Sequence, residues 1–496
     1  MPNLRNREFS LHLVPFHWTD FSGSPKLTST EVKMKRCDVC IIGSGPAGLC
    51  ALSAVREPYT MDSMTYTQVS NANAMMTRRS IAGPPQHRVC VVDPNEKWLS
   101  EWTDNFKRLG IEFLRSPAIA HPDHFDLRSL LAYAVLSGRE AELIESGCAE
   151  IRKLHGLGQT QVGLWKLPST SLFEDFCLYL ADQLPHDYVK SYAIDLDRNE
   201  EGDYVVKLAN GTDVVTSSVI LALGPTGRPV IPEQISQVPK AHLISWKCMI
   251  DELKPCHEIV LVVGGGLTAV QAAQYALRRG KRVYLSSRRQ LVERHFDIDT
   301  CWFDKRSTNL HISEFYHLSE AERLSVLKEA RGGGSVPPIY MKDLREWEKK
   351  GKLTLVTADP DYIGSTDNGK LMIALNEGKT ALFDCIINAC GIKPDCTANP
   401  LIKKITEKFL LKTAGGFPSI SVDLEWTKNL FCVGALASLN VGPDSGNIMG
   451  ARRGASIVAN TLECKAWLRD KEGGALANPF QLLWDDETTD SESEID

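Results

Sequence analysis

A short glycine pattern near the start of the chain could bind the pyrophosphate of a dinucleotide. Gly43, Gly45 and Gly48 form G-x-G-x-x-G between an apolar run and a helix pattern. The first glycine permits a tight turn, the second lets a pyrophosphate approach the backbone, and the third lets the helix pack closely on the strand. The next apolar run, RVCVV, ends at Asp93, whose carboxylate would bind ribose hydroxyls. This context favours a dinucleotide site over a glycine-rich turn without a ligand.

A second glycine pattern occurs much later in the chain and is followed by a different partner. Gly264 and Gly266 stand in VVGGGLTAV, where Ala269 takes the third position, an accepted substitution. The following apolar run, RVYLSS, ends at Arg288 and Arg289 instead of an acid. Guanidinium groups there suit the 2′-phosphate of NADPH, because they form charge-assisted, paired hydrogen bonds with phosphate. The alternative is that both arginines are solvated surface residues.

Two dinucleotide patterns in one chain imply two cofactors. The pattern that leads to Asp93 suits FAD, and the pattern that leads to Arg288 and Arg289 suits NADPH. A nicotinamide supplies hydride, and a flavin is its natural acceptor because it can pass electrons onward or activate O₂. The sequence therefore predicts a flavoprotein oxidoreductase.

The elements that must position these residues alternate between strands and helices. Such alternation predicts parallel sheets with crossover helices. We expect an α/β fold with two Rossmann-type dinucleotide-binding domains, the second inserted in the first. Strands are predicted at 35–42, 88–92, 217–223, 258–263, 282–287, 384–390 and 430–433. The expected divisions are an N-terminal extension (1–34), a first part of the FAD-binding domain (35–235) with an inserted loop (57–86), an NADPH-binding domain (256–384), a second part of the FAD-binding domain (385–465) and a disordered acidic tail (485–496).

Composition and charge argue against several other classes of protein. A net charge of −6 and a pI near 6.1 do not indicate a polyanionic partner. No apolar stretch approaches the ~18 residues of a transmembrane helix, and the first residues lack the features of a signal peptide. No His/Cys/Asp set has the spacing of metal ligands. We therefore expect a soluble cytoplasmic protein without a metal site and without nucleic-acid or membrane partners.

The 14 cysteines are scattered and lie mostly in apolar runs. This indicates buried small hydrophobic residues in a reducing compartment. Cys37 and Cys40 form C-x-x-C, but they lie on a predicted strand, where residues three apart point to opposite faces. Cys385 and Cys390 are farther apart and are also expected on opposite faces. A redox-active pair is therefore not expected.

Several segments together resemble the two-dinucleotide-binding-domain flavoproteins. Besides the two glycine turns, they are ALGPTGRPVIP and the late segment NLFCVGALASLNVGPDSGNIMGARRGA. In that superfamily an A-x-G-x-P stretch marks the crossing between domains, which Ala222 and Gly224 match here. INACGIKP (387–394) resembles the return crossing.

The late segment resembles the one that places a strand end and a helix N-terminus against the flavin. Gly434 matches its glycine. Ala435 replaces the acid that usually follows, so the resemblance implies that Asp444 or Asn447 takes over its role.

Within this superfamily, the chain resembles flavin monooxygenases more than disulfide reductases, which carry C-x-x-C near the flavin. Of the class B fingerprint F-x-G-x-x-x-H-x-x-x-W, only His242 and Trp246 match. A closer similarity is to the ornithine/lysine N-hydroxylase group. EFLRSPAIAHPD, LPSTSLFEDFCLYLADQL and HFDIDTCWFDKR resemble its segments in order and spacing. They carry no amino-acid substrate signature.

The resemblance implies an FAD- and NADPH-dependent monooxygenase. It would insert one oxygen atom from O₂ into a small molecule, such as a secondary metabolite, through a flavin C4a-hydroperoxide. Arg115 matches a basic residue near the flavin and would orient flavin or substrate. His242 would hydrogen-bond the nicotinamide or an intermediate, unless it is a surface or helix-end histidine. An NADPH-dependent flavin oxidoreductase without oxygenation and a non-catalytic regulatory flavoprotein stay open as alternatives.

Overall fold

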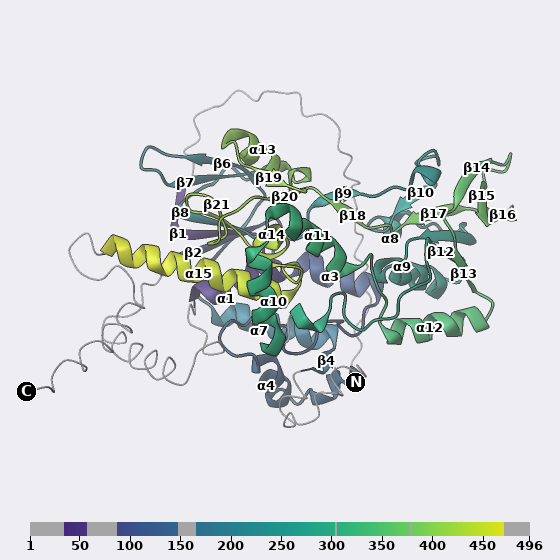
Figure 1. The fold of residues 1–496 in the computed structure, drawn as a ribbon, viewed down its shortest axis with the longest axis horizontal. Helices are drawn as coiled ribbons and strands as arrows, with labels where there is room; N and C mark the ends of the chain where they lie inside the picture. The colour runs from purple at the N-terminus through teal and green to yellow at the C-terminus, as the bar shows by residue number, and fades with distance from the viewer. Residues whose placement is uncertain (1–33, 57–86, 147–164, 303–304, 377–378, 471–496) are drawn as a thin grey trace, which may run out of the picture.

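The computed structural model describes residues 34–56, 87–146, 165–302, 305–376 and 379–470 of the 496-residue chain. The expected insertion at 57–86, the acidic tail and all of the N-terminal extension except Met34 lie outside these residues. The described residues form two mainly parallel sheets with helices packed on them (Figure 1). The α/β fold class predicted from the sequence is confirmed.

The first sheet is built around β1 (Met34–Ile42), which leads into the first glycine turn. It pairs in parallel with β2 (Val89–Asp93) and with β8 (Asp213–Leu221). The three strands are largely buried, as expected for a parallel sheet covered on both faces. The sheet is completed by β5 (Asp187–Lys190) and β22 (Leu430–Cys432), both parallel, and by the antiparallel β6 (Ala193–Arg198), β7 (Tyr204–Leu208) and β21 (Glu425–Thr427).

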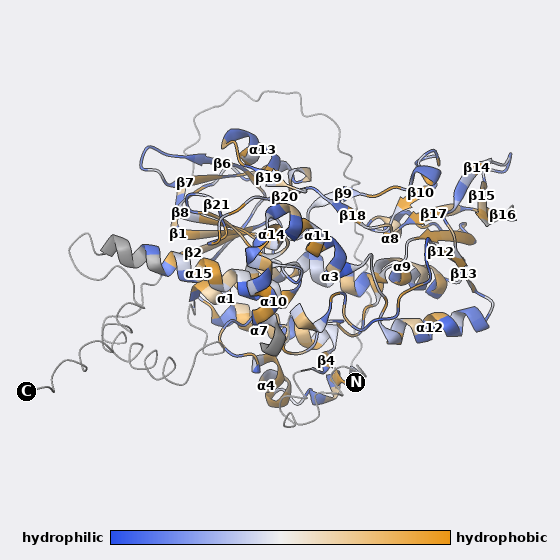
Figure 2. Ribbon diagram, viewed as in Figure 1, coloured by the Kyte–Doolittle hydropathy of each residue, from blue (hydrophilic) through white to orange (hydrophobic). Residues whose placement is uncertain are grey.

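Helices cover both faces of the first sheet. One core joins a face of the sheet to α1 (Pro46–Arg56), α7 (Thr170–Gln183) and α15 (Ile448–Asp470). The other face packs on α13 (Pro400–Lys408). Figure 2 shows the apolar strands between helices whose outer surfaces are more polar. Smaller elements of this part are α3 (Ser100–Leu109), α4 (Ser129–Leu136), α14 (Ser438–Val441), β3 (Leu143–Ile144), β4 (Leu167–Pro168), β19 (Thr413–Ala414) and β20 (Phe417–Pro418).

The second sheet repeats the parallel arrangement. In spatial order it contains β10 (Leu243–Ser245), β17 (Cys385–Asn388), β11 (Ile259–Val263), β12 (Arg282–Ser287) and β13 (Leu353–Thr357). One face packs on α9 (Leu267–Arg278) and α12 (Pro338–Lys349). The other face packs on a three-stranded antiparallel sheet of β14 (Asp361–Ser365), β15 (Leu371–Asn376) and β16 (Lys379–Phe383). The short α8 (Met249–Glu252) lies next to β10.

The second sheet extends beyond the boundaries expected at 256 and 384. β10 begins before the first boundary, and β17 follows the second. Both belong to the second sheet because β17 pairs in parallel with β10 and with β11. The boundary expected at 384 would assign β17 to the FAD-binding domain, whereas its pairing assigns it to the second sheet.

Two short strands carry the chain between the sheets. β9 (Gly227–Pro229) pairs with β18 (Ile392–Pro394) in antiparallel fashion (Figure 1). These strands lie in the two segments that the sequence identified as crossings. They are joined further by an ion pair of 2.7 Å between Arg228 Nε and the Asp395 carboxylate.

Two helices that follow β12 return to the first part of the molecule. They are α10 (Lys305–His317) and α11 (Glu320–Arg331). Arg323 of α11 donates a hydrogen bond of 3.1 Å to the carbonyl oxygen of Leu439 in α14. Among the described residues, none of the helices has both the length and the apolar character needed to cross a membrane.

The predicted orientation of Cys37 and Cys40 is wrong. Both thiols lie in the core under α13, with Cys90 of β2. The alternation of side chains breaks at Asp38, where the N–H groups of Asp38 and Val39 both donate to the Arg88 carbonyl oxygen.

The prediction for the other cysteine pair is confirmed. Cys385 belongs to the core under α9, whereas Cys390 packs on the opposite face of the second sheet.

Candidate functional site

The first glycine turn lies where β1 ends and α1 begins. Gly43 has a φ of 113°, and a Cβ there would overlap the Ala222 carbonyl oxygen. A Cβ at Gly48 would overlap the carbonyl oxygen of Gly43, so neither position can hold a side chain. A Cβ at Gly45, by contrast, would meet no atom within 4 Å. The turn therefore leaves open space in front of the helix N-terminus, as a bound pyrophosphate requires.

Asp93 lies directly behind this turn. One carboxylate oxygen accepts a hydrogen bond of 2.8 Å from the Ser44 N–H. The other accepts two bonds of 2.9 Å from the backbone and side chain of Asn95. The hydroxyl of Tyr188 donates to Ser44 Oγ at 3.0 Å. The structure therefore brings Asp93 to the glycine turn, where a carboxylate fixes the loop next to the ribose position of a dinucleotide.

The second glycine turn has the same construction. Gly264 has a positive φ, and a Cβ there would overlap the Ala389 carbonyl oxygen, just as Gly43 faces that of Ala222. Ala269 is fully buried and takes the place of the third glycine. Each turn thus packs against an alanine at the start of one of the crossing segments. The two sites are structural equivalents.

Arg288 and Arg289 follow β12 and differ in their surroundings. The end of β12 lies beside the turn, because a Cβ at Gly265 would be 3.2 Å from Ser287 Cβ. The Arg288 side chain is exposed, and no hydrogen bond joins it to another described residue. Arg289 Nη2 donates to the Gly332 carbonyl oxygen and, at 3.4 Å, to that of Gly334. Arg288 is therefore free to bind a phosphate, whereas Arg289 already has partners.

The late segment returns to the first glycine turn. Gly434 has a φ of 64°, and a Cβ there would lie 2.8 Å from the Cβ of Ala47 in α1. Ser445 Oγ donates a bond of 2.6 Å to the Gly434 carbonyl oxygen. This places the N-terminal end of α15 beside the N-terminal end of α1. The resemblance predicted this arrangement for the flavin.

Asp444 and Asn447 lie just before α15 and bind different parts of the protein. Asp444 is fully buried and forms an ion pair with Arg453. Burial raises the pKa of Asp444 to about 6, although Arg453 acts in the opposite direction. Asn447 Nδ2 donates a bond of 3.1 Å to Asp297 Oδ1. Asp444 therefore ties the loop to α15, and Asn447 connects it to the segment after β12.

Arg115 connects the two parts of the molecule. Its Nε donates to the His295 carbonyl oxygen at 2.6 Å, and its Nη2 donates to that of Arg294 at 3.0 Å. Nη1 and Nη2 bind the carbonyl oxygen and hydroxyl of Ser335 at 3.3 and 2.7 Å. Burial lowers the pKa of Arg115 to about 10, so the group stays charged near neutral pH. All three guanidinium nitrogens bind protein, so Arg115 acts as a clamp in this structure; its expected role toward flavin or substrate stays a prediction.

His242 lies far from the second glycine turn within its sheet. It directly precedes β10, and its Nδ1 lies 2.9 Å from the Asp384 carbonyl oxygen, just before β17. Asp384 in turn accepts two backbone bonds of 2.8 Å from residues 258 and 259, where β11 begins. These are the amino ends of parallel strands, whereas the glycine turn follows the carboxyl end. The candidate site therefore does not include His242.

Two features of the site were not predicted from the sequence. Asp297 accepts bonds from Asn447 and, at 2.9 Å, from Arg331 Nη1. Of the three glycines that follow, Gly334 packs against Gly266 of the second glycine turn, and Gly333 lies against the guanidinium of Arg289. The run of three glycines between two helix patterns is a signal in the sequence that could have indicated this segment. The contacts of Asp297 have no such signal, because its partners are remote in sequence.

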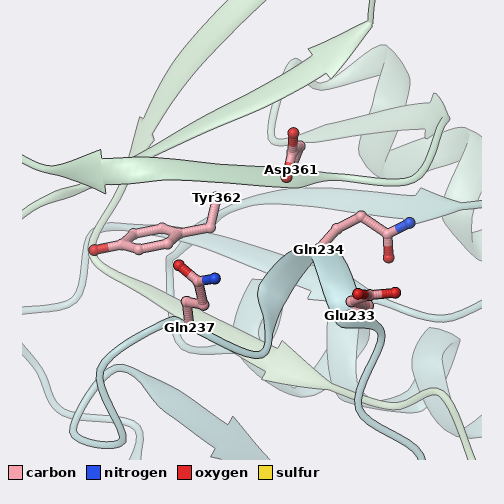
Figure 3. Close-up of a pocket in the computed structure, with 5 residues that line it drawn as sticks. All are labelled: Glu233, Gln234, Gln237, Asp361 and Tyr362. Carbon is pink, nitrogen blue, oxygen red and sulfur yellow. The ribbon is translucent and has the colours of Figure 1, made fainter.

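Two pockets lie outside the glycine turns. A narrow apolar pocket of about 140 Å³ lies between the two parts of the molecule and is lined by Leu114, Arg115, Leu267 and Tyr340, among others. An open pocket of about 260 Å³ lies between η3 (Glu233–Ile235) and β14 (Figure 3). Its lining is polar or acidic and has no cation: Glu233, Gln234, Gln237, Asp361 and Tyr362. Across the part of the chain described here, no group of three or more His, Cys, Asp or Glu side chains could hold a metal ion.

Comparison with known proteins supports this arrangement. Residues 135–302 match the family model of pyridine nucleotide-disulphide oxidoreductases, a range that contains the second glycine turn. A search of curated protein sequences found no match.

Several solved structures share the fold along nearly their whole length. The reduced ornithine hydroxylase of Pseudomonas aeruginosa has a TM-score of 0.60 at 15% identity, covering 86% of this chain and 99% of that one. The ornithine N-hydroxylase of Kutzneria sp. 744, with reduced FAD, NADP⁺ and L-ornithine, has a TM-score of 0.61 at 13% identity, covering 87% and 100%. The FAD-bound cadaverine monooxygenase of Erwinia amylovora has a TM-score of 0.58 at 12% identity, covering 86% and 94%. The expected resemblance is confirmed at the level of the fold: this chain has the two-sheet fold of these ornithine and cadaverine monooxygenases.

Proposed function

We propose that this protein is an FAD- and NADPH-dependent monooxygenase that transfers one oxygen atom from O₂ to a small molecule. The observation that carries the proposal is the pair of equivalent glycine turns. One is backed by the carboxylate of Asp93 and the other by the exposed guanidinium of Arg288. The fold shared with ornithine and cadaverine monooxygenases supports it.

The first sheet and its helices would hold FAD. The open space at Gly45 fits a pyrophosphate, and Asp93 would bind the ribose. Gly434 and the N-terminal end of α15 would face the flavin ring, since helix N–H groups favour electron-rich ligand atoms. The second sheet, from β10 through β17, would hold NADPH at Gly264, Gly266 and Arg288.

Bound together, FAD and NADPH would supply the hydride transfer and the oxygen chemistry. The chain's own residues would bind, orient and exclude water. Arg115 fixes the segment after β12 against the first part of the molecule through four hydrogen bonds. Asp297 ties that same segment to Asn447 at the start of α15. These contacts would keep the space between the two cofactor sites closed to solvent.

We propose a nucleophilic nitrogen of a small amine as the first substrate class to test. The comparison structures are named for ornithine and cadaverine, which both carry primary amines. The guanidinium of Arg115, matched by the resemblance to a basic residue near the flavin, is bound to backbone oxygens here. With these bonds to protein, Arg115 is not available in this structure to bind a substrate carboxylate.

A second candidate is an NADPH-dependent flavin oxidoreductase that does not oxygenate a substrate. The match of residues 135–302 to the pyridine nucleotide-disulphide oxidoreductases favours it. The positions of two cysteine pairs argue against its disulfide branch. Cys385 and Cys390 lie on opposite faces of the second sheet, and Cys37 and Cys40, although close together, are buried in the core under α13. Two intact glycine turns argue against a non-catalytic regulatory flavoprotein.

Isotopically labelled O₂ separates the first two candidates. FAD-loaded protein is supplied with NADPH, labelled O₂ and a panel of aliphatic and aromatic amines, and products are analysed by mass spectrometry. A monooxygenase incorporates one labelled atom into an amine and releases less H₂O₂ per NADPH when that amine is present. Stoichiometric H₂O₂ with every amine, and no labelled product, would contradict oxygenation in favour of the second candidate.

A further inference from the structure

A short glycine segment after α11 lies directly on the second glycine turn. This glycine strap comprises Gly332, Gly333, Gly334 and Ser335. Its three glycines have φ values of 53°, 84° and 93°, a left-handed run that side chains strongly disfavour. A Cβ at Gly334 would lie 3.1 Å from the Cα of Gly266 and 3.6 Å from its backbone nitrogen. The strap therefore covers the backbone that a coenzyme pyrophosphate has to approach.

Arginines hold the strap at both ends. At one end, Arg289 Nη2 donates to the carbonyl oxygens of Gly332 and Gly334. At the other, Arg115 binds both the hydroxyl and the carbonyl oxygen of Ser335. Arg115 is anchored within the protein, whereas Arg289 is exposed and adjoins Arg288 at the end of β12. Only the Arg289 end can respond to a ligand that arrives from solvent.

We infer that the glycine strap closes the coenzyme site of the free protein and that the 2′-phosphate of NADPH opens it by attracting Arg289. This inference rests on the proposed function only in taking NADPH as the coenzyme. A phosphate carries up to two negative charges, so it attracts a guanidinium more strongly than neutral carbonyl oxygens do. No hydrogen bond joins the exposed Arg288 to the strap among the described residues, so its side chain is available for the first contact with the phosphate.

The two arginines therefore discriminate between coenzymes in different ways. Arg288 raises the affinity for NADPH by binding its phosphate directly. Arg289 lowers the affinity for NADH, because a coenzyme without the phosphate must displace a strap that Arg289 still holds. A site that is open only part of the time binds more weakly by the fraction of time it is open.

Equilibrium binding of NADP⁺ and NAD⁺ to the FAD-loaded protein tests this division of roles by calorimetry. In Arg289→Ala we expect NAD⁺ to bind roughly five- to thirtyfold more tightly, the range for losing one or two hydrogen bonds of the strap. In Arg288→Ala we expect NADP⁺ to bind at least roughly tenfold more weakly, with NAD⁺ unchanged. Arg282→Ala, at the exposed start of β12, is the matched control and should behave as wild type. Weaker NADP⁺ and unchanged NAD⁺ in Arg289→Ala would overturn the inference, because Arg289 would then be an ordinary phosphate ligand.

Hydrogen exchange of the strap provides a second, independent readout. The amides of Gly334 and Val336 are bonded to Arg331 and Val292 in the closed strap. NADP⁺ should speed the exchange of the Gly334 amide in the wild type, whereas Val336, next to the end that Arg115 holds, should be unaffected and serves as the internal reference. Gly334→Ala should speed exchange at position 334 without ligand, because its Cβ would press on Gly266. If NADP⁺ binds but the exchange is not faster, the proposed opening of the strap is refuted, while the assignment of NADPH as the coenzyme still stands. A wild-type protein that binds neither coenzyme would refute the NADPH assignment of the proposed function.

Discussion

Removal of the Arg115 side chain tests whether this residue is a clamp. Arg115→Ala deletes four hydrogen bonds of 2.6 to 3.3 Å to residues 294, 295 and 335. Each contributes about 0.5–1.5 kcal/mol, and bonds that share one guanidinium are not additive. We therefore expect the free energy of opening this contact to fall by about 2–4 kcal/mol, roughly a 30- to 1000-fold increase in the open population.

Amide hydrogen exchange measures that change directly. Arg294 N–H donates to the Val336 carbonyl oxygen, and Val336 N–H donates to that of Val292, so both amides report on the contact. Their exchange should accelerate in Arg115→Ala and less so in Arg115→Lys, which keeps the charge but lacks the guanidinium fork. FAD content should not change. Unchanged exchange together with a large loss of turnover would refute the clamp and restore the role toward flavin or substrate.

The remaining predictions concern the two cofactor turns and the buried acid. Gly45→Val should fold as the wild type but lose FAD, because its side chain enters space that no protein atom occupies. Gly48→Ala should instead lower the unfolding midpoint, because its Cβ overlaps the carbonyl oxygen of Gly43. Equal destabilisation by the two substitutions would contradict this account. Asp93→Asn should weaken FAD binding by roughly tenfold, measured by flavin fluorescence, because a neutral amide loses charge-assisted bonds to the ribose and the Ser44 N–H. The pKa of Asp444, raised to about 6, means that the folded state holds this proton more tightly than the unfolded state; the stability that Asp444 contributes should therefore fall by roughly 1 kcal/mol between about pH 5 and pH 7. Urea unfolding of Asp444→Asn should show a flatter pH profile over that range, and an identical slope in both proteins would exclude this assignment.

The glycine turns and the strands before them could be predicted because their signals are local. Gly43 and Gly264 each follow an apolar run and precede a helix, and their conformations are fixed by atoms of the turn and one neighbouring strand. The charged residue at the end of the strand that follows each glycine turn is equally local in sequence, so Asp93 and the end of β12 lie beside the turns as the sequence predicts. The link between Arg289 and a phosphate stays a prediction. The sequence does not show its bonds to the strap, because Gly332 and Gly334 lie more than forty positions away.

The remaining features depend on contacts that are remote in sequence. Arg115 binds residues about 180 and 220 positions away, and these contacts are not evident from the sequence. From its residue type alone, an arginine is equally compatible with a ligand contact and with a structural clamp. The expected role of His242 near the nicotinamide rests on a partial motif match. The order of residues in a motif does not show at which end of a strand the histidine lies. Cys37 and Cys40 share a core because one backbone irregularity at Asp38 breaks the alternation on which the prediction relied.

Anaerobic titration of the FAD-loaded protein with NADPH tests the central claim most directly. The account predicts that the flavin absorbance bleaches with one equivalent of NADPH, that Gly45→Val protein shows no flavin to bleach, and that Arg288→Ala needs a higher NADPH concentration for the same bleaching. A flavin that stays oxidised in excess NADPH would contradict the assignment of the two glycine turns to two cofactors that exchange hydride.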